Sequence, residues 1–93
     1  MEFVYRIHAI ERMFERNISD KLVEDCIRKN DIIERYPDDE PYPSFLVLDF
    51  EDRNPNKPIH VVYAICGEKR IVITAYHPDT KRWNDDFRTR RTS

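Results

Sequence analysis

Three histidines and a tyrosine are the side chains of this sequence best suited to moving protons. Histidine changes charge near neutral pH, so it can act as a general acid or base. His60 opens an apolar run, and Thr74, Tyr76 and His77 end the next one. If the two runs pair as strands through the turn between them, reflection places His60 opposite Thr74 or the following residue, to within a residue or two. We therefore expect His60, Tyr76 and His77 to form a catalytic group, with Thr74 beside it binding substrate.

Basic side chains in two other segments could hold an anionic substrate. His8, Arg12 and Arg16 follow one another at intervals of four residues, so they lie near one face of a helix. Lys81 and Arg82 stand closer to the C-terminus. Because guanidinium groups bind phosphate in forked, charge-assisted contacts, we expect these side chains to bind the phosphate of a substrate. The alternative for the helix face is ion pairing with nearby glutamates.

These residue types suit metal-independent cleavage of RNA. That reaction needs a base for the 2′-hydroxyl, an acid for the leaving 5′-oxygen and cations for the charge that develops on the phosphorane. The alternative for His60 is a histidine that is simply hydrogen-bonded at a strand boundary. We expect no cofactor and no metal. Gly67 is the only glycine, which excludes a Gly-rich phosphate loop, and no Cys or His pair has metal-ligand spacing.

The charged residues are unevenly distributed along the chain, although the net charge is only −2. Residues 31–52 hold eight acidic side chains and one basic one, whereas residues 69–93 hold seven basic and three acidic ones. A basic segment can bind an anionic partner such as RNA or an acidic protein. The alternative is a solvated surface.

Two helices are predicted in the first third of the chain. Apolar side chains recur at helical spacing over Phe3–Arg16, which predicts a helix there. Asn17 would end it, because asparagine tolerates left-handed backbone. Ser19 is the expected N-cap of a second helix, which would end at Asn30. The expected buried stripe of the first helix consists of Phe3, Ile7, Ile10 and Phe14, with Met13 beside them.

The rest of the sequence predicts strands, followed by a C-terminal segment that packs on the sheet. Alternating or continuous apolar runs with short connections favour an antiparallel meander of about four strands, with the third strand central. Asp79–Phe87 is predicted to be a short helix or an irregular cover anchored by Trp83, and residues 88–93 a mobile tail. We therefore expect one α+β domain over residues 1–93, with two N-terminal helices packed on the sheet. The predicted strands are Asp31–Tyr36, Ser44–Phe50, Ile59–Cys66 and Arg70–Tyr76.

Four separated segments resemble the bacterial domain-of-unknown-function 4258 family. They are HAIERMFERNIS (His8 to Ser19), YPDDEPYPSFLVL (Tyr36 to Leu48), PIHVVYA (Pro58 to Ala64) and IVITAYHPDTKRW (Ile71 to Trp83). Many relatives have glycine where this chain has Asn17, which tolerates the same backbone. The layout of two helices followed by an antiparallel sheet resembles, more distantly, the RelE/ParE-like toxins, including BrnT-type toxins. That resemblance implies an endoribonuclease-like toxin neutralised by an antitoxin protein.

Two hypotheses of function follow. The first is a toxin-like domain that cleaves or binds RNA, with His60, Tyr76 and His77 as its proton-transfer groups. The second is a non-catalytic module that binds a protein, for which the two-sided charge distribution would suit an acidic–basic contact. Either could form a homo-oligomer. Because no signal peptide or membrane span is evident, we expect a cytoplasmic protein that does not bind membranes.

Overall fold

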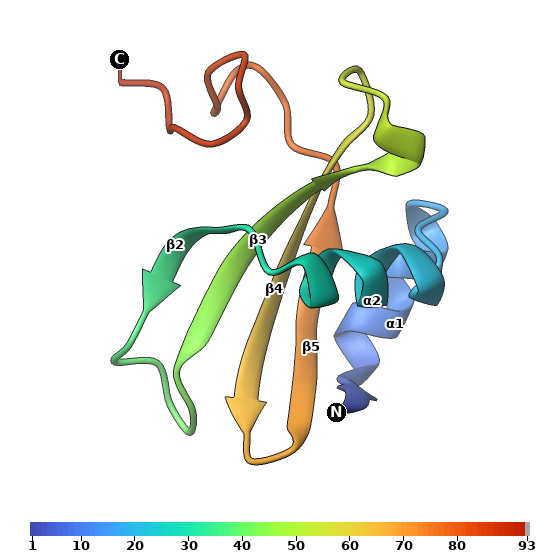
Figure 1. The fold of residues 1–93 in the computed structure, drawn as a ribbon, viewed down its shortest axis with the longest axis vertical. Helices are drawn as coiled ribbons and strands as arrows, with labels where there is room; N and C mark the ends of the chain where they lie inside the picture. Colours follow the sequence, from blue (N-terminus) through green and yellow to red (C-terminus); the bar gives the residue numbers. More distant parts are fainter. Residues whose placement is uncertain (93) are drawn as a thin grey trace.

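A computed structural model describes residues 1–92 as one mixed sheet with two helices on one face (Figure 1). The sheet has five strands in the order β1-β5-β4-β3-β2. β4 lies at its centre, as expected from its nearly continuous apolar sequence. The elements are β1 (Glu2–Tyr5), α1 (Ile7–Glu15), α2 (Asp20–Lys29), β2 (Ile32–Tyr36), β3 (Ser44–Phe50), a 3-10 turn (Glu51–Arg53), β4 (Pro58–Cys66) and β5 (Lys69–Tyr76).

The α+β class and the antiparallel meander from β2 to β5 are confirmed. The sheet has five strands rather than about four, because the prediction missed β1. β1 pairs parallel to β5, with Phe3 opposite Arg70 and Tyr5 opposite Val72. Residues 3–5 were predicted to be helical because Phe3 stands four residues before Ile7. The same residues satisfy the two-residue period of a strand, with Phe3 and Tyr5 half-buried and their neighbours exposed.

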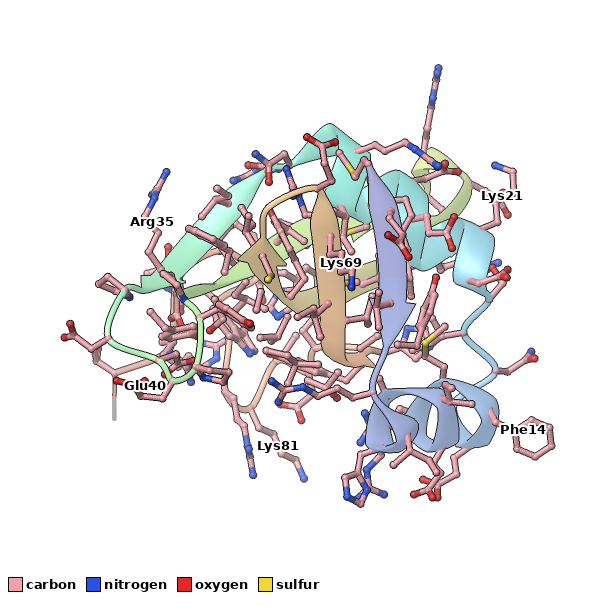
Figure 2. The ribbon with its side chains drawn as sticks, turned by 90° about the horizontal axis from the view of Figure 1, so that it is seen from below. Phe14, Lys21, Arg35, Glu40, Lys69 and Lys81 are labelled. Atoms are coloured by element: carbon pink, nitrogen blue, oxygen red, sulfur yellow. The ribbon has the colours of Figure 1, made fainter. Side chains whose placement is uncertain are left out.

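The predicted buried stripe of the first helix is wrong. Ile7, Ile10 and Phe14 are 68%, 53% and 88% exposed, and the buried residues of α1 are Ala9 and Met13. Figure 2 shows the Phe14 ring pointing away from the body of the molecule. Because β1 fixes where the chain enters the helix, α1 begins only at Ile7 and turns its small Ala9 toward β5 instead.

The predicted helix ends are confirmed. Asn17 has a φ of 55°, and the amide of Ile18 donates to the carbonyl of Met13 (2.8 Å), which closes α1 in a Schellman motif. Ser19 caps α2, with its hydroxyl accepting from the amide of Leu22 at 3.1 Å. Asn30 ends α2 in the left-handed region. These caps fix the helix pair over β3, β4 and β5.

Part of the second face of the sheet is covered by the C-terminal segment, which contacts it at His60 and Glu34. The predicted helix over Asp79–Phe87 does not form, and the alternative of an irregular cover is correct. Carboxylate oxygens of Asp79 and Asp86 accept from nearby backbone amides, so they favour turns over a helix. Trp83 anchors the segment and is only 2% exposed.

Two basic residues near the C-terminus pair with carboxylates in and just before β2. Arg88 pairs with Asp31, and the Nε of Arg90 donates to Glu34 at 2.7 Å. The opposite charges of residues 31–52 and 69–93 therefore meet, in part, within the molecule. These two residues belong to the predicted mobile tail, of which Ser93 lies outside the described residues.

Candidate functional site

The hairpin of β4 and β5 brings the predicted proton-transfer residues together. His60 lies directly opposite Tyr76, one to two residues further along β5 than reflection predicted. The difference arises from a bulge between Val62 and Tyr63, which adds a residue to the register. His77 follows at the end of β5, and Thr74 shares the sheet face of Tyr76.

His60 is fully buried, and both of its ring nitrogens have partners. Its Nε2 lies 2.8 Å from the carbonyl oxygen of Phe87, and its Nδ1 lies 3.1 Å from the hydroxyl of Tyr76. A carbonyl can only accept, so Nε2 carries the hydrogen. In the neutral ring Nδ1 is then an acceptor, and Tyr76 donates its hydroxyl proton to it.

Burial keeps this ring neutral. It lowers the pKa of His60 to about 4, although the Phe87 carbonyl and the charge of Glu34 act in the opposite direction. The charge of Arg90 lowers the pKa further. The indole of Trp83 packs edge-on against the imidazole, with ring centroids 4.6 Å apart. His60 is therefore a structural link between the sheet and the C-terminal segment as well as a partner of Tyr76.

A cavity of about 550 Å³ opens beside this pair. Tyr76 and His77 line it from the end of β5, and Arg16 lines it from the end of α1. The C-terminal segment supplies other walls, among them Asp79, Arg82 and Arg90. Four of the predicted site residues thus share one cavity: Arg16, Tyr76, His77 and Arg82.

The three arginines of the cavity differ in how far they are already engaged. Arg16 donates one Nη hydrogen to the carbonyl of Ala75 at 2.8 Å, which fixes its position. Arg90 binds Glu34 through two nitrogens. Arg82 has no ion-pair partner among residues 1–92. It is therefore the cation of the cavity with the most donors left for a ligand.

His77 has one nitrogen fixed and one open. Its Nδ1 lies 3.3 Å from the carbonyl of Pro58, which can only accept, so Nδ1 carries a hydrogen. In the neutral ring Nε2 then holds the lone pair, and the side chain is exposed at the cavity. An imidazole in this state can take a proton from a ligand or return one to it.

The other predicted substrate-binding residues lie outside the residues that line the cavity. Arg12 donates to Glu15 at 3.1 Å, so the alternative of ion pairing holds for Arg12, and Nδ1 of His8 lies 3.5 Å from Glu11 on the same helix. Lys81 is exposed on the C-terminal segment, and Thr74 is half-buried on β5.

Sequence reasoning missed Asp79 and Arg90 as cavity residues. Asp79 uses one carboxylate oxygen to accept from the amides of Lys81 and Arg82, so it shapes the turn that carries Arg82. The guanidinium of Arg90 lies 4.7 Å from the centre of the Trp83 ring, a cation–π contact. Residues 31–52 are mostly acidic where charged and residues 69–93 mostly basic. This opposite charge was the one feature of the sequence that could have suggested the pairing of Arg90 with Glu34.

A family described as a domain of unknown function, DUF4258, matches residues 5–77, so the chain belongs to this family. No curated protein and no solved structure matches the chain. The family match includes α1 and β5 with Arg16, Tyr76 and His77, and it ends before the segment that supplies Arg82. No helix among residues 1–92 is long and apolar enough to cross a membrane.

Proposed function

We propose that this member of the DUF4258 family binds RNA in the cavity beside His77 and cleaves the phosphodiester without a metal ion. One observation carries the proposal. The cavity combines phosphate-binding cations, Arg16 and Arg82, with the proton-exchanging imidazole of His77 and the hydroxyl of Tyr76. Each of these groups has a role in cleavage of RNA through its own 2′-oxygen.

The arginines would hold the phosphate. Arg82 enters the cavity without an ion-pair partner among the described residues, and Arg16 is positioned by its bond to the Ala75 carbonyl. The carboxylate of Asp79 also lines the cavity, but its bonds to backbone amides direct part of its charge into the turn. Guanidinium groups would bind the phosphate in the ground state and stabilise the extra charge of the phosphorane.

The proton transfers would fall to the histidines. His77 lines the cavity and has one ring nitrogen without a partner among the described residues, and Tyr76, which also lines it, bonds to Nδ1 of His60. Two proton-transfer groups at one phosphate are what a reaction with a separate base and acid requires. His60 is fully buried, so it would not contact the substrate as the sequence predicted. It would instead exchange protons through the hydroxyl of Tyr76.

We further propose that the chain is the toxin-like component of a toxin–antitoxin pair, acting in the cytoplasm. The proposal rests on the resemblance of the helix pair and antiparallel meander to RelE/ParE-like toxins and on the basic cavity. An antitoxin-like protein could neutralise it by placing carboxylates against Arg16 and Arg82, in the place of the RNA phosphate.

Binding of RNA tests the proposal without requiring turnover. The anisotropy of a labelled single-stranded RNA would be measured against His77→Ala, which slows cleavage of the probe, and against the same variant carrying Arg82→Ala or Lys81→Ala in addition. The two substitutions remove adjacent positive charges, but only Arg82 lines the cavity. We expect Arg82→Ala to weaken binding about tenfold and to reduce the slope of log Kd against log salt by about one. Equal losses from both variants would indicate a non-specific charge effect and contradict the proposed site.

A second candidate function is favoured by the exposed apolar side chains of α1. Ile7, Ile10 and Phe14 occupy positions i, i+3 and i+7, the spacing by which one helix anchors to another surface. We propose that a second copy of this chain covers them. Arg12 and Glu15 of the same helix are of opposite sign and pair with each other, so this pair adds no net charge to the surface.

Self-association tests this second candidate. Three side chains bury less than the roughly 800 Å² per partner of a standard interface, so we expect a weak dimer that forms only at high concentration. Sedimentation velocity should show mass increasing with concentration for the wild type and for Lys21→Glu, a charge change on the exposed face of α2. Phe14→Glu should stay monomeric. A wild type that remains monomeric throughout would refute the dimer.

A further inference from the structure

The hydrogen bond between Tyr76 and His60 determines what Tyr76 can offer a ligand. Nε2 of His60 donates to the Phe87 carbonyl, so Nδ1 accepts the hydroxyl proton of Tyr76. A phenol has one proton to donate. With that proton directed into the core, the oxygen of Tyr76 keeps only lone pairs for the cavity that its side chain lines.

This arrangement lasts as long as His60 is neutral. The ring is fully buried between β4, β5 and Trp83, where desolvation disfavours a charged imidazole. The charged groups near it are Glu34 of β2 and Arg90 of the C-terminal segment, and these two neutralise each other in an ion pair. Tyr76 is therefore held as a hydrogen-bond acceptor at neutral pH.

Tyr76, as a hydrogen-bond acceptor beside Arg16 and Arg82, favours a ligand that carries both a phosphate and a neutral hydrogen-bond donor. The lone pairs of Tyr76 repel a phosphate oxygen, so the phosphate must lie toward Arg16 and Arg82. The position beside Tyr76 is left for a neutral donor. In RNA the 2′-hydroxyl is such a donor, and it stands next to the 3′-phosphate on the same sugar. DNA has the phosphate without the donor.

We propose that Tyr76 accepts a hydrogen bond from the ribose 2′-hydroxyl of the nucleotide whose phosphate Arg16 and Arg82 hold, so that the cavity takes RNA and rejects DNA. This inference rests on the proposed function and assigns the two sides of the reaction. Tyr76 and His60 stand on the side of the attacking oxygen, and His77 stands on the side of the leaving oxygen.

With these roles, every proton in the reaction has a donor and an acceptor. The 2′-oxygen forms a bond to phosphorus while its proton passes to the oxygen of Tyr76, and the proton of Tyr76 passes to Nδ1 of His60. Burial disfavours the imidazolium that forms, and the nearby carboxylate of Glu34 and the Phe87 carbonyl offset part of that cost for the short life of the charge. The bond between phosphorus and the 5′-oxygen breaks, and Nε2 of a protonated His77 gives its proton to that oxygen. The products are a 2′,3′-cyclic phosphate and a 5′-hydroxyl. Water then returns a proton to His77 and removes one from the Tyr76–His60 pair.

Paired RNA and DNA probes test the inference. The two labelled single strands would have the same sequence of adenine and cytosine, so that they differ only at the 2′-position. Binding would be measured in a His77→Ala background, which slows cleavage of the RNA probe enough for binding to be recorded first. We expect RNA to bind about tenfold more tightly than DNA, the value of one hydrogen bond that DNA lacks. Adding Tyr76→Phe should bring the ratio to about one by weakening RNA binding alone.

His60→Gln separates positioning from packing. Glutamine can donate to the Phe87 carbonyl and accept from Tyr76, but its amide cannot take up a proton. As a single substitution it should abolish cleavage, and in the His77→Ala background it should keep the RNA preference. If it removes the preference while Tyr76→Phe leaves it intact, Tyr76 is not the reader of the 2′-hydroxyl.

The possible failures are distinguishable. Equal binding of RNA and DNA that is lost in Arg82→Ala would leave the phosphate site standing and overturn the role of Tyr76. A ratio that Tyr76→Phe does not change would also overturn it. If neither nucleic acid binds, the proposed function fails together with this inference.

Discussion

His60 and Tyr76 stand opposite each other on β4 and β5, and a hydrogen bond of 3.1 Å joins the buried imidazole to the hydroxyl of Tyr76, a residue that lines the cavity. The same imidazole donates to the Phe87 carbonyl on the C-terminal segment. One side chain therefore connects the sheet, the segment that covers it and the cavity between them. A change at His60 should affect stability and the cavity together.

Replacement of His60 by alanine should destabilise the fold strongly. The substitution leaves the Tyr76 hydroxyl and the Phe87 carbonyl without their partner and opens a cavity beside Trp83. We expect the free energy of unfolding to fall by about 2–4 kcal/mol in urea denaturation. His8→Ala, at an exposed position, should change it by less than about 0.5 kcal/mol. Equal effects of the two substitutions would contradict the packing of His60.

Stability should decrease as the pH falls below neutrality. The pKa of His60 is lowered from 6.5 to about 4 in the folded chain, so between these values the unfolded chain binds a proton that the folded chain does not. Acid therefore favours unfolding, by about 2 kcal/mol between pH 7 and pH 5. Asp31 and Glu34, whose pKa values are lowered by their arginine partners, would add a further loss only at more acidic pH.

Urea denaturation at pH 7 and pH 5 checks this dependence. At pH 7 the free energy of unfolding of His60→Gln should be no higher than that of the wild type. Between pH 7 and pH 5 it should change little. The same decrease in the wild type and in His60→Gln would assign the titration to another group.

Asn17 should be replaceable by glycine but not by alanine. Its φ of 55° is a left-handed conformation that glycine adopts freely and alanine does not. We expect Asn17→Gly to leave the free energy of unfolding unchanged within about 0.5 kcal/mol and Asn17→Ala to lower it by about 1 kcal/mol. Thermal unfolding of the two variants measures the difference. An alanine variant as stable as the glycine variant would contradict the Schellman closure of α1.

The meander and the helix caps could be predicted from sequence because local signals define them. Ser19 and Asn30 bracket α2, and the alternation from Ser44 to Phe50 gives the bounds of β3. β1 could not be predicted in this way, because its partner β5 is more than sixty residues away along the chain. The orientation of α1 depends on β1, which is why Ile10 and Phe14 were assigned to the core and lie on the surface.

In the candidate site too, local relationships could be predicted from sequence and long-range contacts could not. His60, Tyr76 and His77 were found together because hairpin pairing is a local rule. The bonds of His60 to the Phe87 carbonyl and of Arg90 to Glu34 join residues 27 and 56 positions apart. No periodicity marks such contacts. That Arg16 reaches the cavity while Arg12 does not depends on the rotation of α1, which only the packing of Ala9 and Met13 determines.

Cleavage of a labelled single-stranded RNA in the presence of EDTA is the most direct test of the proposed function. Wild type, His77→Ala and His8→Ala would be compared at equal concentration, and the ends of the fragments would be identified. We expect the wild type and His8→Ala to give fragments with 2′,3′-cyclic phosphate ends, and His77→Ala to be slower by about a hundredfold or more. Intact RNA with the wild type, or equal cleavage by His77→Ala, would contradict catalysis at this cavity.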